Sequence, residues 1–167
     1  MMQQFIKYVD SPLGKLTLAS HGHSLTGLWF ENQKYYGDLL DEPIEKDLLI
    51  FDKVERWLEA YFQGQNPPID FELELIGTDF RKRVWKQLLK IPFGEVMTYD
   101  ALATIIANET EKNKCAQAIG QAIGHNPVSI IIPCHRVVGK NGNLTGYAGG
   151  IDKKISLLKL EGIDLSQ

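Results

Sequence analysis

The sequence predicts an α+β protein built from two small domains, residues 1–77 and 78–167. Apolar and polar residues alternate in much of the first 30 residues, as in half-buried strands. After residue 78 the apolar residues recur at helical spacing instead. The charge changes at the same place: residues 1–77 hold 6 Lys and Arg against 13 Asp and Glu, and residues 78–167 hold 12 against 8. The second part is therefore the basic one, which suits a polyanionic partner.

The first domain should be a small antiparallel sheet with one helix. Strands are predicted over residues 5–9, 16–19 and 25–30, with turns at Ser11–Gly14 and His21–His23. Residues 47–62 then show the spacing of an amphipathic helix. Residues 64–68 end this helix, and residues 71–75 form an extended exit toward the second domain.

The second domain should be mostly helical. Thr78 or Asp79 can cap its first helix, which Pro92-Phe93-Gly94 ends, and Thr98 can cap the next one. Asn113 can cap a third helix, over residues 114–123, with Gly124 directly after it. The polar turn at residues 108–112 makes the last two helices a candidate helix-turn-helix.

The third helix has two distinct faces. One is apolar and should be buried: Cys115, Ala118, Ile119, Ala122 and Ile123. The other carries polar and small residues: Lys114, Ala116, Gln117, Gly120 and Gln121. Small residues let a helix backbone approach another surface closely, and a single cation implies phosphate and shape contacts with little sequence preference. By itself this pattern favours packing against another helix over a contact with nucleic acid.

Cys134 is the first candidate for chemistry. It follows Ile130-Ile131-Ile132, three β-branched residues that predict a buried strand, and Pro133, which should end that strand. The side chains of His135 and Arg136 would favour the thiolate, which is the nucleophilic form. A small buried hydrophobic residue is an equally good interpretation of this segment alone.

Several motifs of the second half occur together in one known family. They are Pro133–Val137, Pro92–Glu95 with Thr98-Tyr99, Gly124–Pro127, Gly142–Gly150 and Leu157–Gly162. In order and spacing over residues 79–162 the chain resembles the methylated-DNA–protein-cysteine methyltransferases, or O6-alkylguanine-DNA alkyltransferases. Residues 1–77 carry no such motif.

The resemblance implies a fold and a reaction. Residues 1–77 would adopt a ribonuclease H-like fold without that activity, and residues 78–167 a winged-helix-like domain that binds DNA and transfers the alkyl group. The reaction would move an alkyl group from O6 of guanine, or from O4 of thymine, to Cys134 after the nucleotide is flipped out. Each molecule would act once, without metal or other cofactor. The partner would be double-stranded DNA containing alkylated guanine, contacted in the minor groove by a monomer.

The resemblance also assigns roles in the reaction. His135 would take the proton of Cys134 through a water, Glu161 would orient His135, and Tyr99 would donate to the leaving guanine. Other residues would shape the surroundings of Cys134: Asn126, Pro133 and Arg136 in its loop, and Tyr147, Ala148 and Gly149 in the wall of the alkyl pocket.

DNA would be contacted by Lys114, Ala116, Gln117 and Gly120, by the same resemblance. Two positions depart from the family pattern. Gln117 stands where an Arg usually enters the base stack, and it offers neither a cation nor a planar guanidinium. Ala148 stands where other members carry Ser, so it replaces a hydroxyl donor with an apolar wall.

Composition limits the alternatives. Two cysteines, the lack of an apolar N-terminal segment and the lack of any stretch near the roughly 20 residues that cross a bilayer predict a cytoplasmic protein without a membrane contact. His21 and His23 have no Cys nearby and predict no metal site. A sensor that flips the damaged base without repairing it, a Cys-His hydrolase and a helix-turn-helix regulator remain as alternative functions.

Overall fold

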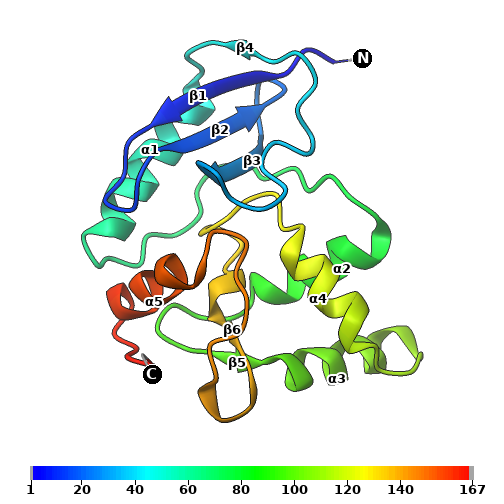
Figure 1. The fold of residues 1–167 in the computed structure, drawn as a ribbon. Helices are drawn as coiled ribbons and strands as arrows, with labels where there is room; N and C mark the ends of the chain where they lie inside the picture. The colour runs from blue at the N-terminus through cyan, green and yellow to red at the C-terminus, as the bar shows by residue number, and fades with distance from the viewer. Residues whose placement is uncertain (1, 166–167) are drawn as a thin grey trace. The chain divides into compact units, whose positions relative to one another are not determined.

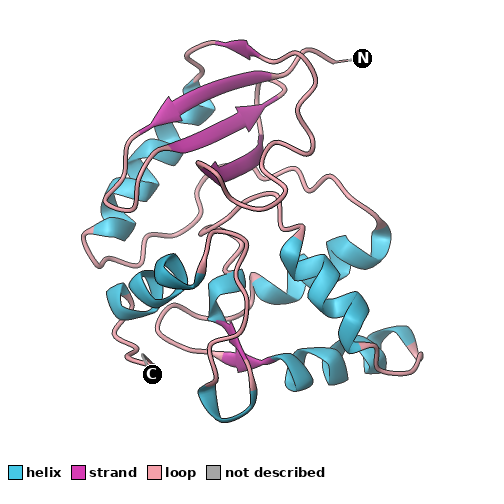
Figure 2. Cartoon of the chain, viewed as in Figure 1, coloured by secondary structure: helices cyan, strands magenta, loops and turns pink. Residues whose placement is uncertain are grey.

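The structure is a computed structural model that describes residues 2–165, and it forms two compact units. The first unit runs to Ile76 and also takes in Pro127–Ser129. The second begins at Gly77 and resumes at Ile130. Figures 1 and 2 show the sheet of the first unit and the helices that dominate the second. The α+β class predicted from the sequence is confirmed.

The described residues of the first unit form a four-stranded sheet and one helix. The strands are β1 (Phe5–Val9), β2 (Leu16–Ser20), β3 (Leu25–Phe30) and β4 (Ile44–Glu45), in the order β3-β2-β1-β4. Neighbours among β1, β2 and β3 are antiparallel, and β4 runs parallel to β1. Helix α1 (Leu49–Phe62) lies along one face of this sheet (Figure 1). The three longer strands and α1 confirm the sequence prediction, whereas β4 was not predicted.

The free edge of β3 is covered by two other segments of the first unit. Leu25 exchanges backbone hydrogen bonds with Glu72 and Glu74, at 2.8 and 3.0 Å. Leu28 does the same with Pro127 and Ser129, at 2.8 and 2.9 Å. An uncovered edge strand is a site for unwanted pairing between chains, and these segments remove it. Residues 127–129 are thereby held in the first unit, five residues before Cys134.

Up to residue 165, where the description ends, the second unit contains four α-helices, two 3₁₀ turns and a pair of short strands. In chain order they are α2 (Asp79–Leu88), β5 (Met97–Thr98), α3 (Tyr99–Thr110), α4 (Ala116–Gly124), η1 (Cys134–Arg136), β6 (Val137–Val138), η2 (Lys140–Gly142) and α5 (Ile151–Leu160). The predicted caps are present: Thr78 Oγ1 accepts from Arg81 N, and Thr98 Oγ1 accepts from Ala101 N. Within residues 2–165 no helix is long and apolar enough to span a membrane.

The parallel pair β5–β6 was not predicted. Met97 pairs with Val137 and Thr98 with Val138. Each strand is only two residues long, too short to leave a periodic pattern in the sequence. The pairing places the start of α3, where Tyr99 lies, next to the strand that follows η1, three residues after Cys134.

Helix α4 begins later than predicted. It starts at Ala116 with Cys115 as its N-cap residue, so Asn113 is not the cap, Lys114 precedes the helix and Gly124 lies inside its end. The prediction that Cys115 is buried is wrong, because its side chain is exposed. Cys115 has φ −136° and ψ 94°, so the helical spacing on which the prediction rested does not extend to it.

Residues 130–132 are buried, but they do not form the predicted strand. They form a turn in which Ile130 has φ +72°, a left-handed conformation that is rare for a β-branched residue. A continuous apolar run indicates burial without distinguishing a strand from other backbone conformations. Cys134 therefore lies at the start of the turn η1, and the expectation that neighbouring side chains alternate there as on a strand does not apply.

Replacing Gly27 with Ala should destabilise the protein. The Trp29 indole lies over the Cα of Gly27, where an added methyl group would overlap the ring. Trp29 is buried, so we expect the free energy of unfolding to fall by about 1–3 kcal/mol in a denaturant titration. The control is Gly120→Ala in α4, where the added methyl meets open space and should raise helix stability. Equal stability of the two variants would contradict the packing argument.

Candidate active site

Cys134 is held in a closed loop by the side chain of Asn126. The Asn126 amide Nδ2 donates to the Ile132 carbonyl at 2.8 Å and to Cys134 Sγ at 3.1 Å. Both side chains are almost completely buried, with Cys134 2% exposed and Asn126 3%. Asn126 therefore fixes both the backbone before the thiol and the sulfur itself.

Burial acts against ionisation of the Cys134 thiol. Burial raises the pKa of Cys134 to about 11, although the Asn126 hydrogen bond and the nearby charge of Lys154 act in the opposite direction. His135 and Arg136, which were expected to favour the thiolate, are themselves engaged with Glu161. Burial lowers the pKa of His135, and the Arg136 guanidinium is paired with Glu161.

Glu161 is the centre of the polar network beside the thiol. It caps the C-terminal end of α5, and its carboxylate is fully buried. Oε2 accepts from His135 Nε2 at 2.6 Å and from Arg136 Nη2 at 3.1 Å. Oε1 accepts from Arg136 Nε at 2.8 Å and from the Gly94 backbone N–H at 3.0 Å. One carboxylate thus receives four hydrogen bonds from two distant segments of the chain.

The hydrogen bonds to Glu161 determine which member of the His135–Glu161 pair carries the shared proton. Burial alone would raise the pKa of Glu161, but the hydrogen bonds from His135 and Arg136 outweigh it and lower that pKa to about 2. The ionised carboxylate has no proton to give, so His135 Nε2 carries the shared hydrogen. In the neutral imidazole, Nδ1 is then the basic nitrogen. The arrangement makes His135 a base whose protonated form Glu161 would stabilise.

Arg136 and Gly94 join the turn after α2 to this network. Arg136 Nη1 donates to the Ile91 carbonyl at 2.7 Å, and the guanidinium carbon lies 5.9 Å from the centre of the Phe93 ring. Gly94 has φ +82°, a conformation that glycine adopts without strain, and this turn directs its N–H at Glu161. Arg136 thus connects the residues next to Cys134 with the turn after α2 and the end of α5.

Tyr99 is the first residue of α3 and is half-buried. Burial raises the pKa of Tyr99, and a hydrogen bond with Thr145 acts the other way. The Tyr99 hydroxyl therefore keeps its proton at neutral pH and can donate it in a hydrogen bond. Tyr147, Ala148 and Gly149 are also half-buried, and the Tyr147 ring meets His135 edge-on with centroids 6.5 Å apart.

A cavity of about 860 Å³ opens beside Tyr99. Its wall comes from α3, from the start of α4 and from η2: Thr98, Tyr99, Asp100, Ala103, Lys114, Ala116, Lys140 and Asn141. Three predicted site residues, Tyr99, Lys114 and Ala116, are thus brought to one hollow. Cys134 is not part of this wall.

The remaining predicted DNA contacts lie on the exposed side of α4. Ala116, Gln117 and Gly120 are all exposed. Lys114, just before the helix, is half-exposed, and its ammonium pairs with Asp100 at 2.9 Å. An exposed ion pair of this kind contributes little stability, so it leaves the lysine available for another anion.

Lys154 was missed by the sequence reasoning. It is a lysine on α5 with no exposed surface, and its ammonium donates to the carbonyls of Val137 and Thr145 at 2.7 and 3.0 Å. Its spacing could have indicated the burial. Lys154 lies three and four residues before the buried Leu157 and Leu158, on the apolar face of the helix.

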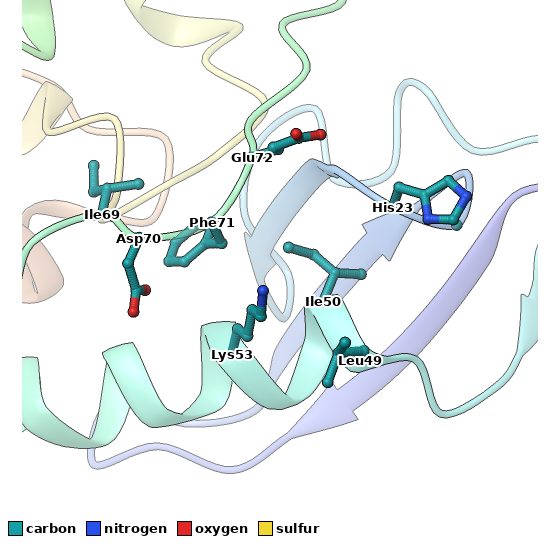
Figure 3. A pocket seen from close by; sticks show the side chains of 9 residues that line it. His23, Leu49, Ile50, Lys53, Ile69, Asp70, Phe71 and Glu72 are labelled. Atoms are coloured by element: carbon teal, nitrogen blue, oxygen red, sulfur yellow. The ribbon is translucent and has the colours of Figure 1, made fainter.

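A second hollow, of about 750 Å³, lies in the first unit beside α1 and residues 69–72 (Figure 3). His23, Lys53, Asp70 and Glu72 are among its lining residues. Their charged ends do not converge on one point in Figure 3. This hollow therefore lacks the arrangement of groups seen around Cys134.

Comparisons with known proteins agree on one family. Residues 79–163 match the model of the 6-O-methylguanine DNA methyltransferase DNA binding domain, and residues 5–75 that of its ribonuclease-like domain. The chain is 47% identical over 157 residues to a methylated-DNA–protein-cysteine methyltransferase of Mycobacterium tuberculosis, covering 92% of this chain and 89% of the relative. The protein of that name in Methanosarcina acetivorans is 43% identical over 153 residues, covering 92% and 95%.

A solved structure is similar over nearly the whole chain. The crystal structure of Mycobacterium tuberculosis OGT in complex with DNA has a TM-score of 0.81 and 45% identity, covering 94% of this chain and 92% of that one.

Replacing Glu161 with Gln should destabilise the second unit strongly. The change leaves the buried Arg136 guanidinium without a counter-charge, at a cost of about 3–5 kcal/mol. The pKa of Glu161 is lowered from 4.5 to about 2, so its ionisation stabilises the fold above pH 4.5 and this contribution is lost as the pH falls toward 2. Unfolding measured from pH 7 to 2 should therefore be less pH-dependent in the variant.

Glu109→Gln is the matched control, since Glu109 pairs with the partly exposed Arg83. It should change stability by less than about 1 kcal/mol. A loss in Glu161→Gln as small as that of the control would contradict the central role of the buried carboxylate.

Proposed function

Because the chain belongs to the 6-O-methylguanine DNA methyltransferase family, we propose that it repairs DNA by moving an alkyl group from O6 of guanine to Cys134. The family matches carry the activity, which is DNA repair by alkyl transfer. One observation carries the choice of Cys134: a buried thiol that accepts from Asn126 and directly precedes the His135–Glu161 pair. The other cysteine, Cys115, is exposed and outside this network.

The reaction is a displacement at the alkyl carbon. The S–H proton of Cys134 passes through a water to His135 Nδ1, and the sulfur then attacks the alkyl group. A C–S bond forms while the bond between the carbon and O6 breaks. The electron pair leaves with the guanine, whose developing charge is met by the Tyr99 hydroxyl. Glu161 stabilises the imidazolium of His135, as a carboxylate does in a hydrolase triad.

The chemistry of the product explains why each protein molecule would transfer only one alkyl group. An S-alkylcysteine is a neutral thioether, and no group of the proposed mechanism can return it to a thiol. The transfer itself needs no metal or organic cofactor, because the nucleophile, base and hydrogen-bond donor are all side chains. Pro133 and Arg136 would hold the Cys134 loop in place, and Tyr147, Ala148 and Gly149 would form the wall against the alkyl group.

The damaged nucleotide must leave the duplex to reach Cys134. The cavity beside Tyr99, which also includes Lys114 and Ala116, is the proposed entry for the flipped nucleotide. Ala116 and Gly120 give α4 a surface of small exposed residues that could lie in the minor groove, with little sequence preference. Gln117 would occupy the space that the extruded base leaves.

The proposal also covers the roles of the two domains, the oligomeric state and the location of the protein in the cell. Residues 78–167 would bind DNA and carry the reaction, with O4-alkylthymine as a second possible substrate. Residues 1–77 would support them, and the protein would act as a monomer in the cytoplasm. The exposed side of α4 carries no cation of its own among its residues 116–124, which suits contacts to phosphates from flanking lysines such as Lys114 and Lys140.

The direct test uses a duplex containing one O6-methylguanine. We expect the peptide that bears Cys134 to gain the mass of one methyl group, guanine to be restored, and no second turnover. Cys134→Ser should bind the duplex without gaining mass at this peptide. Tight binding by the unaltered protein with no mass change would instead indicate a sensor that does not repair.

Replacing Gln117 with Arg should raise the repair rate more on duplex DNA than on the free base O6-methylguanine. A guanidinium can stack in the gap left by the flipped nucleotide, and this matters only when a duplex is opened. Single-turnover rates on both substrates give the comparison. Gln121→Arg, one turn further along α4 and also exposed, controls for added charge. An equal effect of Gln117→Arg on both substrates would contradict the proposed role.

A further inference from the structure

The positive charge of the second domain is concentrated at one helix. Residues 79–90, which comprise α2 and the two residues after it, hold five Lys and Arg against one Asp. Residues 91–167 hold seven Lys and Arg against seven Asp and Glu. The whole excess of positive charge in residues 78–167 is therefore located at residues 79–90.

Three lysines of this segment form an exposed surface, the α2 basic face: Lys82, Lys86 and Lys90. Lys82 and Lys86 lie four residues apart and so share one side of the helix, and Lys90 follows the C-cap residue Leu89. Lys86 and Lys90 are exposed, and Lys82 is half-exposed. Within residues 2–165 no carboxylate forms an ion pair with any of the three.

Helix α2 packs directly against α4 (Figure 1). The indole nitrogen of Trp85 on α2 donates to the Ala122 carbonyl of α4 at 2.8 Å. A hollow of about 290 Å³ is lined by Arg83 of α2 and by Lys112 and Lys114 in the turn before α4. Lys114 also lines the proposed entry for the flipped nucleotide. Basic residues thus continue from that entry, past the start of α4, onto α2.

Binding to DNA requires cations that α4 does not have. Much of the affinity of a protein for DNA comes from Lys and Arg side chains that contact phosphates and release counterions. Residues 116–124 of α4 contain no Lys or Arg. Arg83 is already paired with Glu109 at 3.3 Å. The α2 basic face supplies cations without such a pairing, on the helix that packs against α4.

We propose that the α2 basic face binds phosphates of the same DNA duplex, outside the segment that α4 covers. This inference rests on the proposed function, in which α4 contacts the duplex at the damaged nucleotide. Helix α4 has nine residues and is about 14 Å long, which corresponds to about four base-pair steps. Contacts from α2 extend the bound length of DNA beyond these base pairs.

Phosphate contacts act on binding and not on the choice of sequence. Phosphates are the same at every base pair, so the α2 basic face raises the affinity for damaged and undamaged duplexes by the same factor. It leaves the transfer step at Cys134 unchanged. Electrostatic contacts also let a protein move along DNA. This suits a protein that must pass many undamaged base pairs before it meets an alkylated one.

The test removes two of the charges in Lys86→Gln/Lys90→Gln, at exposed positions where Gln and Lys have similar helix propensity. Binding to duplexes of about 12 and about 30 base pairs is measured by fluorescence anisotropy over a range of salt concentrations. On the longer duplex we expect the affinity at low salt to fall at least about tenfold. The slope of log K against log salt should decrease in magnitude by about 1.8, since each phosphate contact contributes about 0.9. Both changes should be much smaller on the shorter duplex.

Two matched variants control for the charge. Lys46→Gln/Lys159→Gln makes the same change of net charge at exposed lysines outside α2 and should leave the slope unchanged. Lys86→Arg/Lys90→Arg keeps the charge and should keep the slope of the unaltered protein. An unchanged slope in Lys86→Gln/Lys90→Gln would overturn the proposal. So would an equal decrease in the Lys46→Gln/Lys159→Gln control, or an equal loss on both duplex lengths.

Methyl transfer and stoichiometry are measured with the same variants. The single-turnover rate at saturating O6-methylguanine duplex should be unchanged in Lys86→Gln/Lys90→Gln. The competing partner is a second copy of this chain, whose residues 1–77 are acidic. Weaker cooperativity with an unchanged affinity of the first bound molecule would indicate that partner and overturn the proposal. If the unaltered protein transfers no methyl group, the proposed function fails, while the salt dependence of duplex binding still tests α2.

Discussion

The site depends on one buried carboxylate. Glu161 accepts four hydrogen bonds, two from Arg136, one from His135 and one from the Gly94 backbone. Through these bonds the end of α5, the turn after α2 and the residues next to Cys134 are joined at one point. A buried charge is tolerated only when it is paired and fully hydrogen-bonded, so the position of each partner is tightly restricted. The orientation of His135 follows from this requirement.

The surroundings of Cys134 affect its ionisation in opposite directions. Burial outweighs the favourable effects of Asn126 and Lys154 and raises the pKa of Cys134 to about 11. Because the thiolate is the form of cysteine that reacts with oxidants, burial of Cys134 also limits its oxidation.

The backbone path to Cys134 is constrained at successive points. Residues 127–129 are hydrogen-bonded to β3, Ile130 reverses the chain in a left-handed conformation, and Asn126 closes the loop onto Ile132 and the sulfur. A β-branched residue persists in that conformation only when its surroundings determine it, and such strain is often found beside functional groups. Residues 127–129, which belong to the first unit, thus begin the segment that leads to Cys134.

The sequence by itself determined the features that rest on local patterns. The strands at residues 5–9 and 25–30, the helix α1 and the caps Thr78 and Thr98 follow from periodicity and from hydrogen bonds over a few residues. The motif around Cys134 determined the family, which the comparisons confirm. Only the tertiary structure decided the β5–β6 pairing, the turn at residues 130–132 and the burial of Glu161 and Lys154 beside Cys134. These features depend on contacts between segments that are far apart in the chain. A local sequence pattern does not indicate how exposed a side chain will be or which charges will surround it.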